Sequence, residues 1–190
     1  MEITQRIAKT SPQFKARTAG FFWLMTIMGG SLALFVGGDL GQAANIVSTV
    51  CYIAATLLVY YLLKPVNRSL SLLAACFSLV GCTLGLARMF LIVLAQVGTI
   101  SFAFFGLHCL LVGYLIFRST FLPRFVGALM AIGGFGWLIL GLSSTLSPAL
   151  GRSLSPYILI PGILGEVSLT LWLLVKGINV TKWEEKAGVL

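Results

Sequence analysis

Three ionisable residues, His108, Glu166 and Arg88, interrupt apolar stretches of the chain that otherwise contain almost no charge. His108 is the only histidine and lies in the apolar residues 100–117, while Glu166 lies in residues 157–175. An imidazole and a carboxylate can exchange protons with a substrate or hold a polar ligand, and a guanidinium can form an ion pair with the carboxylate. These residue types therefore predict a polar site within an apolar protein.

The apolar stretches themselves predict the fold. The chain has 190 residues, 58% of them hydrophobic and only 9% charged, whereas about 25% of the residues of soluble domains are charged. A helix needs ~20 apolar residues to cross a bilayer, and continuously apolar runs favour helices over the alternating strands of a barrel. We therefore predict an all-α, polytopic membrane protein with a bundle of six transmembrane helices. The expected spans are residues 17–36, 43–63, 70–95, 100–117, 125–142 and 157–175.

The positions of Lys and Arg predict the orientation, because short cytoplasmic loops are enriched in these residues. Basic residues occur in the N-terminal segment 1–16, in the loops after the second and fourth spans, and in the tail 177–190, whereas the opposite loops carry only Arg152. We expect both termini to be cytoplasmic. In the sequence, they flank a transmembrane domain of residues 17–176. The net charge of +8 then reflects topology and attraction to anionic membrane lipid, and it does not require a nucleic acid as partner.

A weak repeat and many glycines suggest how the spans pack. The segments "ARTAGFFWLMTIMGG" and "PRFVGALMAIGG" share an R-x-x-G start followed by a Gly-Gly pair, and "NRSLSLLAAC" also has a basic entry. This pattern hints at three successive helical hairpins. The 21 glycines indicate close helix contacts, and Gly106, Cys109 and Gly113 share one helix stripe.

The predicted depths of the ionisable residues place them near the bilayer centre. Glu166 is the midpoint of the sixth span and His108 lies at the midpoint of the fourth, whereas Arg88 lies roughly 8 Å outward of the third span's midpoint at ~1.5 Å per residue. A charged residue at the centre of a helix costs about 2.5–3.5 kcal/mol on insertion scales, so it normally faces the interior of the bundle. We expect Glu166 to contact Arg88 or His108. The predicted ligand-binding residues are Glu166, His108, Arg88, Asp39, Ser101 and Thr170.

Two of these candidates extend the site along the bundle. Thr170 shares a helix stripe with Glu166, and Asp39 is expected at the extracytoplasmic mouth with Gln42 and Asn45. Pro161 removes a backbone donor close to the expected outer end of the sixth span, which would allow a bend near the site.

The sequence lacks the usual patterns of catalytic and cofactor sites. The four cysteines all fall within predicted spans, and no C-x-x-C pair, G-x-S-x-G elbow or multi-histidine set occurs. We therefore predict no cofactor, no metal ligand and no catalytic residue.

Three segments carry a resemblance to a known family: "LLKPVNRSLSLLAACFSLV", "FFGLHCLLVGYLIFRSTFLPRFVG" and "GEVSLTLWLLVKG". Together with the opening "ARTAGFFWLMTIMGG", they resemble the bacterial membrane family called domain of unknown function 4386. The resemblance covers most of the chain and implies a multi-pass protein of the bacterial inner membrane. It implies no activity.

Three functions remain open at this level. The first hypothesis is that the polar residues form a site that binds or translocates a small-molecule or lipid-like ligand, because ionisable residues within a membrane mark functional sites by default. The same residues are also consistent with a structural network that only fixes helix packing. A third hypothesis, an intramembrane enzyme acting on a lipid, has no nucleophile to support it.

Overall fold

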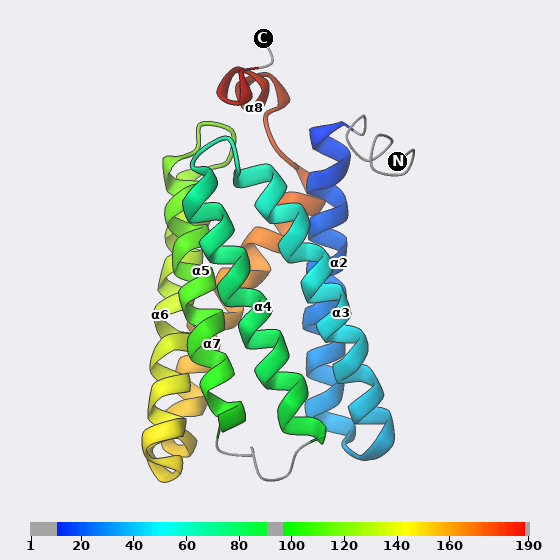
Figure 1. Ribbon diagram of the computed structural model, residues 1–190, viewed down its shortest axis with the longest axis vertical. Helices are drawn as coiled ribbons and strands as arrows, with labels where there is room; N and C mark the ends of the chain where they lie inside the picture. The colour runs from blue at the N-terminus through cyan, green and yellow to red at the C-terminus, as the bar shows by residue number, and fades with distance from the viewer. Residues whose placement is uncertain (1–10, 91–96, 189–190) are drawn as a thin grey trace.

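The computed structural model describes residues 11–90 and 97–188, and helices make up nearly all of them (Figure 1). The long helices are α2 (Pro12–Val36), α3 (Gly38–Leu63), α4 (Arg68–Phe90), α5 (Ser101–Arg118), α6 (Arg124–Leu146) and α7 (Pro148–Val175). A 3-10 turn, η2 (Val97–Ile100), precedes α5, and the short helix α8 (Val180–Ala187) follows α7. No strand occurs in the described residues, which confirms the predicted all-α fold.

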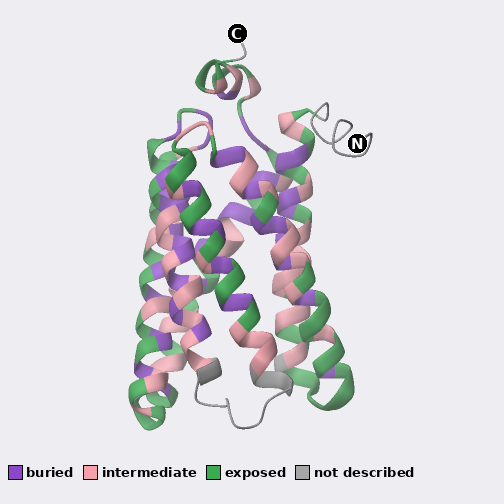
Figure 2. Ribbon diagram, in the orientation of Figure 1, coloured by how far each residue is buried: buried purple, intermediate pink, exposed green. Residues whose placement is uncertain are grey.

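The six long helices form a closed ring. Each helix from α2 to α7 packs against the next one in the chain, and α7 packs back against α2. In Figure 2 the buried residues lie where helices face one another, whereas exposed residues follow the outside. Many exposed side chains are large and apolar, among them Phe21, Leu57 and Phe135. Such a surface suits hydrocarbon and not water.

Five of the long helices, α3 to α7, are long and apolar enough to cross a membrane. Together they make this a multi-pass membrane protein. The first predicted span falls in α2, which has 25 residues but is not among these five, so the count of six spans stays a prediction. The last residues of the third predicted span, 91–95, lie outside the described residues.

The sixth span begins earlier than the sequence pattern indicated. α7 starts at Pro148, directly after Ser147, whose hydroxyl accepts a hydrogen bond from the Leu150 amide at 3.5 Å. Serine at the N-cap and proline in the first turn are a strong start signal. Pro156 and Pro161 both lie inside this helix. Pro161 therefore lies near the middle of α7 and not close to its outer end, where the sequence pattern had placed it.

Glycines bring α5, α6 and α7 into direct backbone contact. A Cβ atom added to Gly134 would lie 2.7 Å from the Leu110 nitrogen and 2.9 Å from the Gly106 oxygen. One added to Gly165 would lie 2.7 Å from the Leu129 oxygen. Such distances leave no room for a side chain, and close backbone approach provides van der Waals contact that lipid cannot replace.

The two ends of the described chain meet at one end of the ring, here called the α8 end (Figure 1). The Gln13 side chain on α2 donates to the Lys176 oxygen and accepts from the Ile178 amide, both at 2.9 Å. The predicted basic tail contains α8, which the sequence analysis missed. Trp183 of α8 is buried and donates through Nε1 to the Leu62 oxygen at 2.8 Å, so α8 covers the end of α3.

The glycine contacts lead to a stability prediction. We expect Gly134→Ala to lower the free energy of unfolding by about 1–3 kcal/mol, because the new methyl group would overlap backbone atoms of α5. Gly85→Ala is the matched control, since a Cβ atom at Gly85 meets nothing within 4 Å. The control should be neutral or stabilising by up to about 1 kcal/mol. Melting temperatures in one detergent test this, and equal values for the two variants would contradict the glycine contacts.

Candidate functional site

Aromatic rings from three helices surround the interior of the ring at mid-height. The Trp23 ring of α2 lies 5.6 Å from the Tyr52 ring of α3, measured between centroids, and 6.0 Å from the His108 ring of α5. The Tyr52 and His108 rings are 5.9 Å apart. Trp23 and His108 are almost fully buried. These three rings form one wall of the site.

Glu166 completes the site from α7, which packs beside α2 in the ring. Its Oε2 atom accepts a hydrogen bond from Trp23 Nε1 at 3.3 Å. Glu166 also lies near the Tyr52 hydroxyl, and the Trp137 indole of α6 lies beside the carboxyl group without forming a hydrogen bond of good geometry. Glu166 is only half-buried, although the wall around it is buried. Among the side chains that the structure describes, no cation pairs with it.

His108 is held in one orientation by a neighbouring helix. Its Nδ1 atom lies 2.8 Å from the backbone oxygen of Ala74 on α4. A carbonyl oxygen can only accept, so Nδ1 carries the hydrogen, and in the neutral imidazole Nε2 is then an acceptor. Nε2 is buried and has no partner among the described residues. His108 therefore presents a fixed acceptor to its surroundings.

Several buried polar atoms around this site have no hydrogen-bond partner. Besides His108 Nε2, they are the Tyr52 hydroxyl, Trp137 Nε1 and the Thr170 hydroxyl. A buried polar group without a partner costs about 1–3 kcal/mol, and such groups are few in native proteins. We call the residues that carry these atoms, together with the bonded pair Trp23 and Glu166, the central polar cluster. Its members are Trp23, Tyr52, His108, Trp137, Glu166 and Thr170. Its four unpaired atoms are chemically able to bond a ligand or water.

The structure brings together three of the six predicted site residues. Glu166, His108 and Thr170 belong to the central polar cluster, with Thr170 one helical turn beyond Glu166 on α7. No hydrogen bond joins Glu166 and His108. Trp23 instead touches both, through its indole N–H on Glu166 and its ring beside His108.

The other three predicted residues are distributed along the bundle. Asp39 is exposed in the first turn of α3, ~20 Å along the helix from Tyr52 at ~1.5 Å per residue. Ser101 is buried at the start of α5, ~10 Å from His108 by the same rise. The Arg88 side chain lies outside the described structure, and its position on α4 is ~21 Å beyond Ala74. Its pairing with Glu166 stays a prediction.

The sequence analysis missed Trp23, Tyr52 and Trp137. Aromatic residues are common in apolar spans, and many of those in this chain, such as Phe35 and Phe135, are exposed on the outside. No spacing separates the inward rings from the outward ones. The one sequence feature that could have pointed to these three residues is that Trp and Tyr, unlike Phe, carry a polar atom that needs a partner when it is buried.

Neither of two pockets on the molecule is lined by His108 or Glu166. One of these lies at the α8 end and the other between α5 and α6 on the outer surface. Within the described residues, no group of three or more metal-binding side chains occurs. The four cysteines are free thiols.

A ring of long apolar helices around a polar cluster defines a polytopic α-helical membrane protein. Comparison with known sequences identifies its family: the family described as "Domain of unknown function (DUF4386)" matches residues 83–177, half of the chain. The chain belongs to the DUF4386 family, as the sequence resemblance indicated.

One curated relative is similar over a large part of the chain. It is an uncharacterized protein from Archaeoglobus fulgidus, 28% identical over 122 residues, which are 62% of this chain and 72% of the relative. No solved structure gives a significant match. Neither comparison assigns a ligand or a reaction.

The bond between Trp23 and Glu166 leads to a second prediction. We expect Trp23→Phe to lower the free energy of unfolding by about 1–3 kcal/mol, because it removes the donor and leaves a carboxyl oxygen unpaired. Glu166→Gln keeps an acceptor oxygen and should cost much less. Trp172→Phe is the matched control, since the Trp172 indole makes no hydrogen bond within the described part of the chain.

Thermal unfolding of the three variants in one detergent measures these differences. If Trp23→Phe and Trp172→Phe lost the same stability, the bond to Glu166 would contribute nothing, and the description of the site would be wrong.

Proposed function

We propose that this protein binds, and moves across the membrane, a small-molecule or lipid-like ligand at the central polar cluster. The observation that carries this proposal is the Glu166 carboxyl group, which is half-buried inside the ring and pairs with no described cation. Ionisable groups within membranes are costly and mark ligand or ion pathways by default. The four unpaired polar atoms nearby add further positions for ligand contacts.

The composition of the cluster indicates what the ligand presents. Glu166 accepts hydrogen bonds or attracts positive charge, and His108 Nε2 accepts as well. The indole N–H of Trp137, beside Glu166, and the hydroxyl of Tyr52, beside the Cys109 thiol, are donors that form no well-aligned hydrogen bond. The rings of Trp23 and Tyr52 offer apolar faces. The ligand that suits this cluster has a polar head with hydrogen-bond donors and an apolar body.

We also propose that the protein lies in a bacterial inner membrane with the α8 end in the cytoplasm. The start of α2, the loops α3–α4 and α5–α6, and the tail share that end, and they contain most of the basic residues. At the opposite end, Arg152 is the only basic residue in the described loops and helix starts. The positive-inside rule supports this orientation.

The structural hypothesis also has a specific observation behind it. Several buried hydroxyl groups join neighbouring helices directly, including the Thr56 and Ser78 hydroxyls at 2.7 Å and the Ser48 hydroxyl on the Thr26 oxygen at 2.8 Å. If Glu166 belongs to this group, its bond to Trp23 serves packing alone. The hypothesis of a lipid-modifying enzyme has no comparable observation in the described structure.

Copurification separates the two functions. The protein would be purified in lipid nanodiscs, and its bound small molecules would be extracted and identified by mass spectrometry. We expect a molecule in stoichiometric amount with the parent protein, reduced about tenfold or more by Glu166→Gln and by Thr170→Val. Glu166→Gln removes the negative charge and one acceptor oxygen, Thr170→Val removes a hydroxyl, and a tenfold loss corresponds to about 1.4 kcal/mol. Neither variant should lower the melting temperature markedly.

Thr83→Val is the matched control, because Thr83 is exposed on α4 and its hydroxyl bonds only to its own helix, at the Leu79 oxygen. It should retain the molecule. If the parent protein carries nothing specific and Glu166→Gln unfolds it, the structural hypothesis replaces this proposal.

A further inference from the structure

Two hollows on the surface of the molecule share one side chain, Phe117. The first, here called the basic pocket, lies at the α8 end and has a volume of about 330 Å³. The second, here called the apolar groove, lies between α5 and α6 on the outer surface and has a volume of about 470 Å³. Phe117, the residue before the last of α5, lines both. The two hollows are therefore adjacent parts of one surface.

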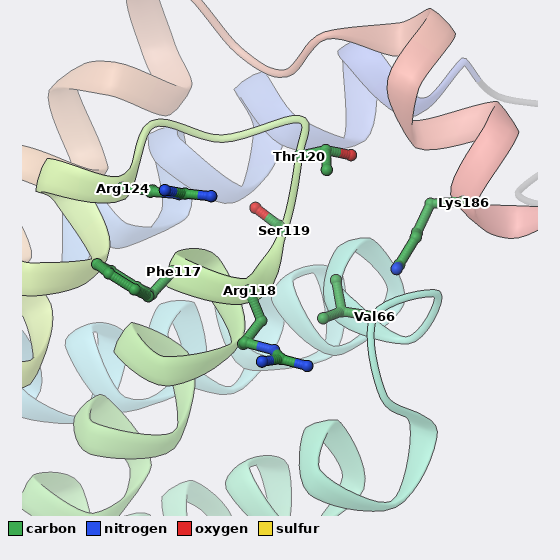
Figure 3. Close-up of a pocket in the computed structure, with 7 residues that line it drawn as sticks. All are labelled: Val66, Phe117, Arg118, Ser119, Thr120, Arg124 and Lys186. Atoms are coloured by element: carbon green, nitrogen blue, oxygen red, sulfur yellow. The ribbon is translucent and has the colours of Figure 1, made fainter.

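The basic pocket concentrates positive charge and hydroxyl groups. Arg118, Arg124 and Lys186 line it together with Ser119 and Thr120, and no acidic residue is among the lining residues. Figure 3 shows these side chains around one hollow, with Lys186 reaching in from α8 and Arg124 from the start of α6. Guanidinium and ammonium groups are the usual partners of phosphate oxygens. The Thr120 hydroxyl lies beside them, whereas the Ser119 hydroxyl already donates to the Ile116 oxygen at 2.7 Å.

The cations come from separate elements that the fold holds together. Arg118 ends α5, Arg124 begins α6, and Lys186 lies in the last turn of α8. α8 is fixed there by the bond from Trp183 to the Leu62 oxygen. Three like charges repel one another unless an anion or solvent screens them. Their convergence on one pocket therefore favours an anionic occupant.

The apolar groove would hold a second, uncharged part of the same occupant. Its walls include Leu110, Tyr114, Phe117, Ala128 and Ile132. Its floor is shallow because α5 and α6 approach closely there: a Cβ atom on Gly113 would lie 2.7 Å from the Gly127 oxygen. From Leu110 to Phe117 the groove follows α5 for ~10 Å. This length and character suit part of an acyl chain in the hydrocarbon region.

We propose that the basic pocket and the apolar groove together bind one anionic phospholipid, with its phosphate among Arg118, Arg124 and Lys186 and an acyl chain between α5 and α6. Phe117 connects the two parts, and the Arg124 guanidinium carbon lies 5.6 Å from the centre of its ring. A free phosphate would use the basic pocket alone, whereas a phospholipid uses both hollows. The site is separate from the central polar cluster, and its occupancy does not depend on the function proposed there.

Native mass spectrometry of the purified protein with defined lipids tests this proposal. The probes are phosphatidylglycerol, which is anionic, and phosphatidylcholine, which has a phosphate but no net charge. We expect phosphatidylglycerol to bind the parent protein and the double variant Arg118→Gln, Arg124→Gln to bind it about tenfold or more weakly, since each basic contact contributes appreciably. Phosphatidylcholine should bind weakly to both. Equal binding of the two lipids to the parent protein would overturn the proposal.

The chain offers a matched control for general electrostatic attraction. Lys64 and Arg68 are exposed at the same end of the molecule but do not line the basic pocket. The double variant Lys64→Gln, Arg68→Gln removes the same charge and should retain phosphatidylglycerol. If it loses as much binding as the pocket variant, the attraction is not specific to this pocket, and the proposal fails.

A third variant distinguishes the phospholipid from free phosphate. Ala128 is exposed in the apolar groove, so Ala128→Trp fills the groove without entering the core. We expect it to weaken phosphatidylglycerol binding, while Leu72→Trp, on the exposed surface of α4, leaves binding unchanged. If Ala128→Trp has no effect and inorganic phosphate displaces the lipid, the pocket takes free phosphate, and the lipid proposal is wrong.

Discussion

The need to surround one carboxyl group within a membrane governs much of this structure. Glu166 lies away from both ends of α7, at a depth in the membrane where water is scarce. An ionisable group at such a depth is tolerated when protein or a polar interior surrounds it. The ring of α2 to α7 provides that enclosure. The Trp23 indole supplies the hydrogen bond, and rings from α3 and α5 complete the wall. The closure of the ring between α2 and α7 thus places the Trp23 donor beside the Glu166 carboxyl group.

The rest of the architecture allows this enclosure to stay compact. Lipid gives helices no hydrophobic reason to associate, so association depends on close contact and on polar bonds. Glycines provide the contact among α5, α6 and α7, and hydroxyl pairs such as Thr56 with Ser78 provide polar bonds elsewhere. α8 then covers the α8 end through Trp183, and Lys15 of α2 lies over the Tyr61 ring at 3.6 Å, next to the stacked Trp183. Aromatic and cationic groups thus close the end of the ring that carries most of the positive charge.

The sequence predicted the helices well and the site only in part. Apolar length is a strong signal, so the helices were evident from the sequence. The residue types of His108 and Glu166 made these two residues candidates for a polar site. The start of α7 was missed because Arg152, Ser153 and Ser155 look like a loop, although Ser147 and Pro148 carry a helix-start signal. Which residue meets Glu166 could not be predicted, because the choice of Trp23 depends on α2 and α7 closing the ring. When lipid and the protein interior are equally apolar, the sequence of a span shows no periodic pattern that tells which side chains face inward.

The central claim is our proposal that Glu166 belongs to a ligand site inside the ring, which predicts that polar molecules reach this position. Cysteine accessibility tests it most directly, in a protein whose four native cysteines are replaced and which is held in lipid nanodiscs. The Glu166→Cys variant should react with a small charged thiol reagent about tenfold or more faster than a Leu171→Cys variant, because charged reagents need water and hydrocarbon excludes them. Leu171 lies on the same helix and is exposed on the outer surface. Equal and slow reaction of the two cysteines would contradict the account and leave Glu166 a packing residue.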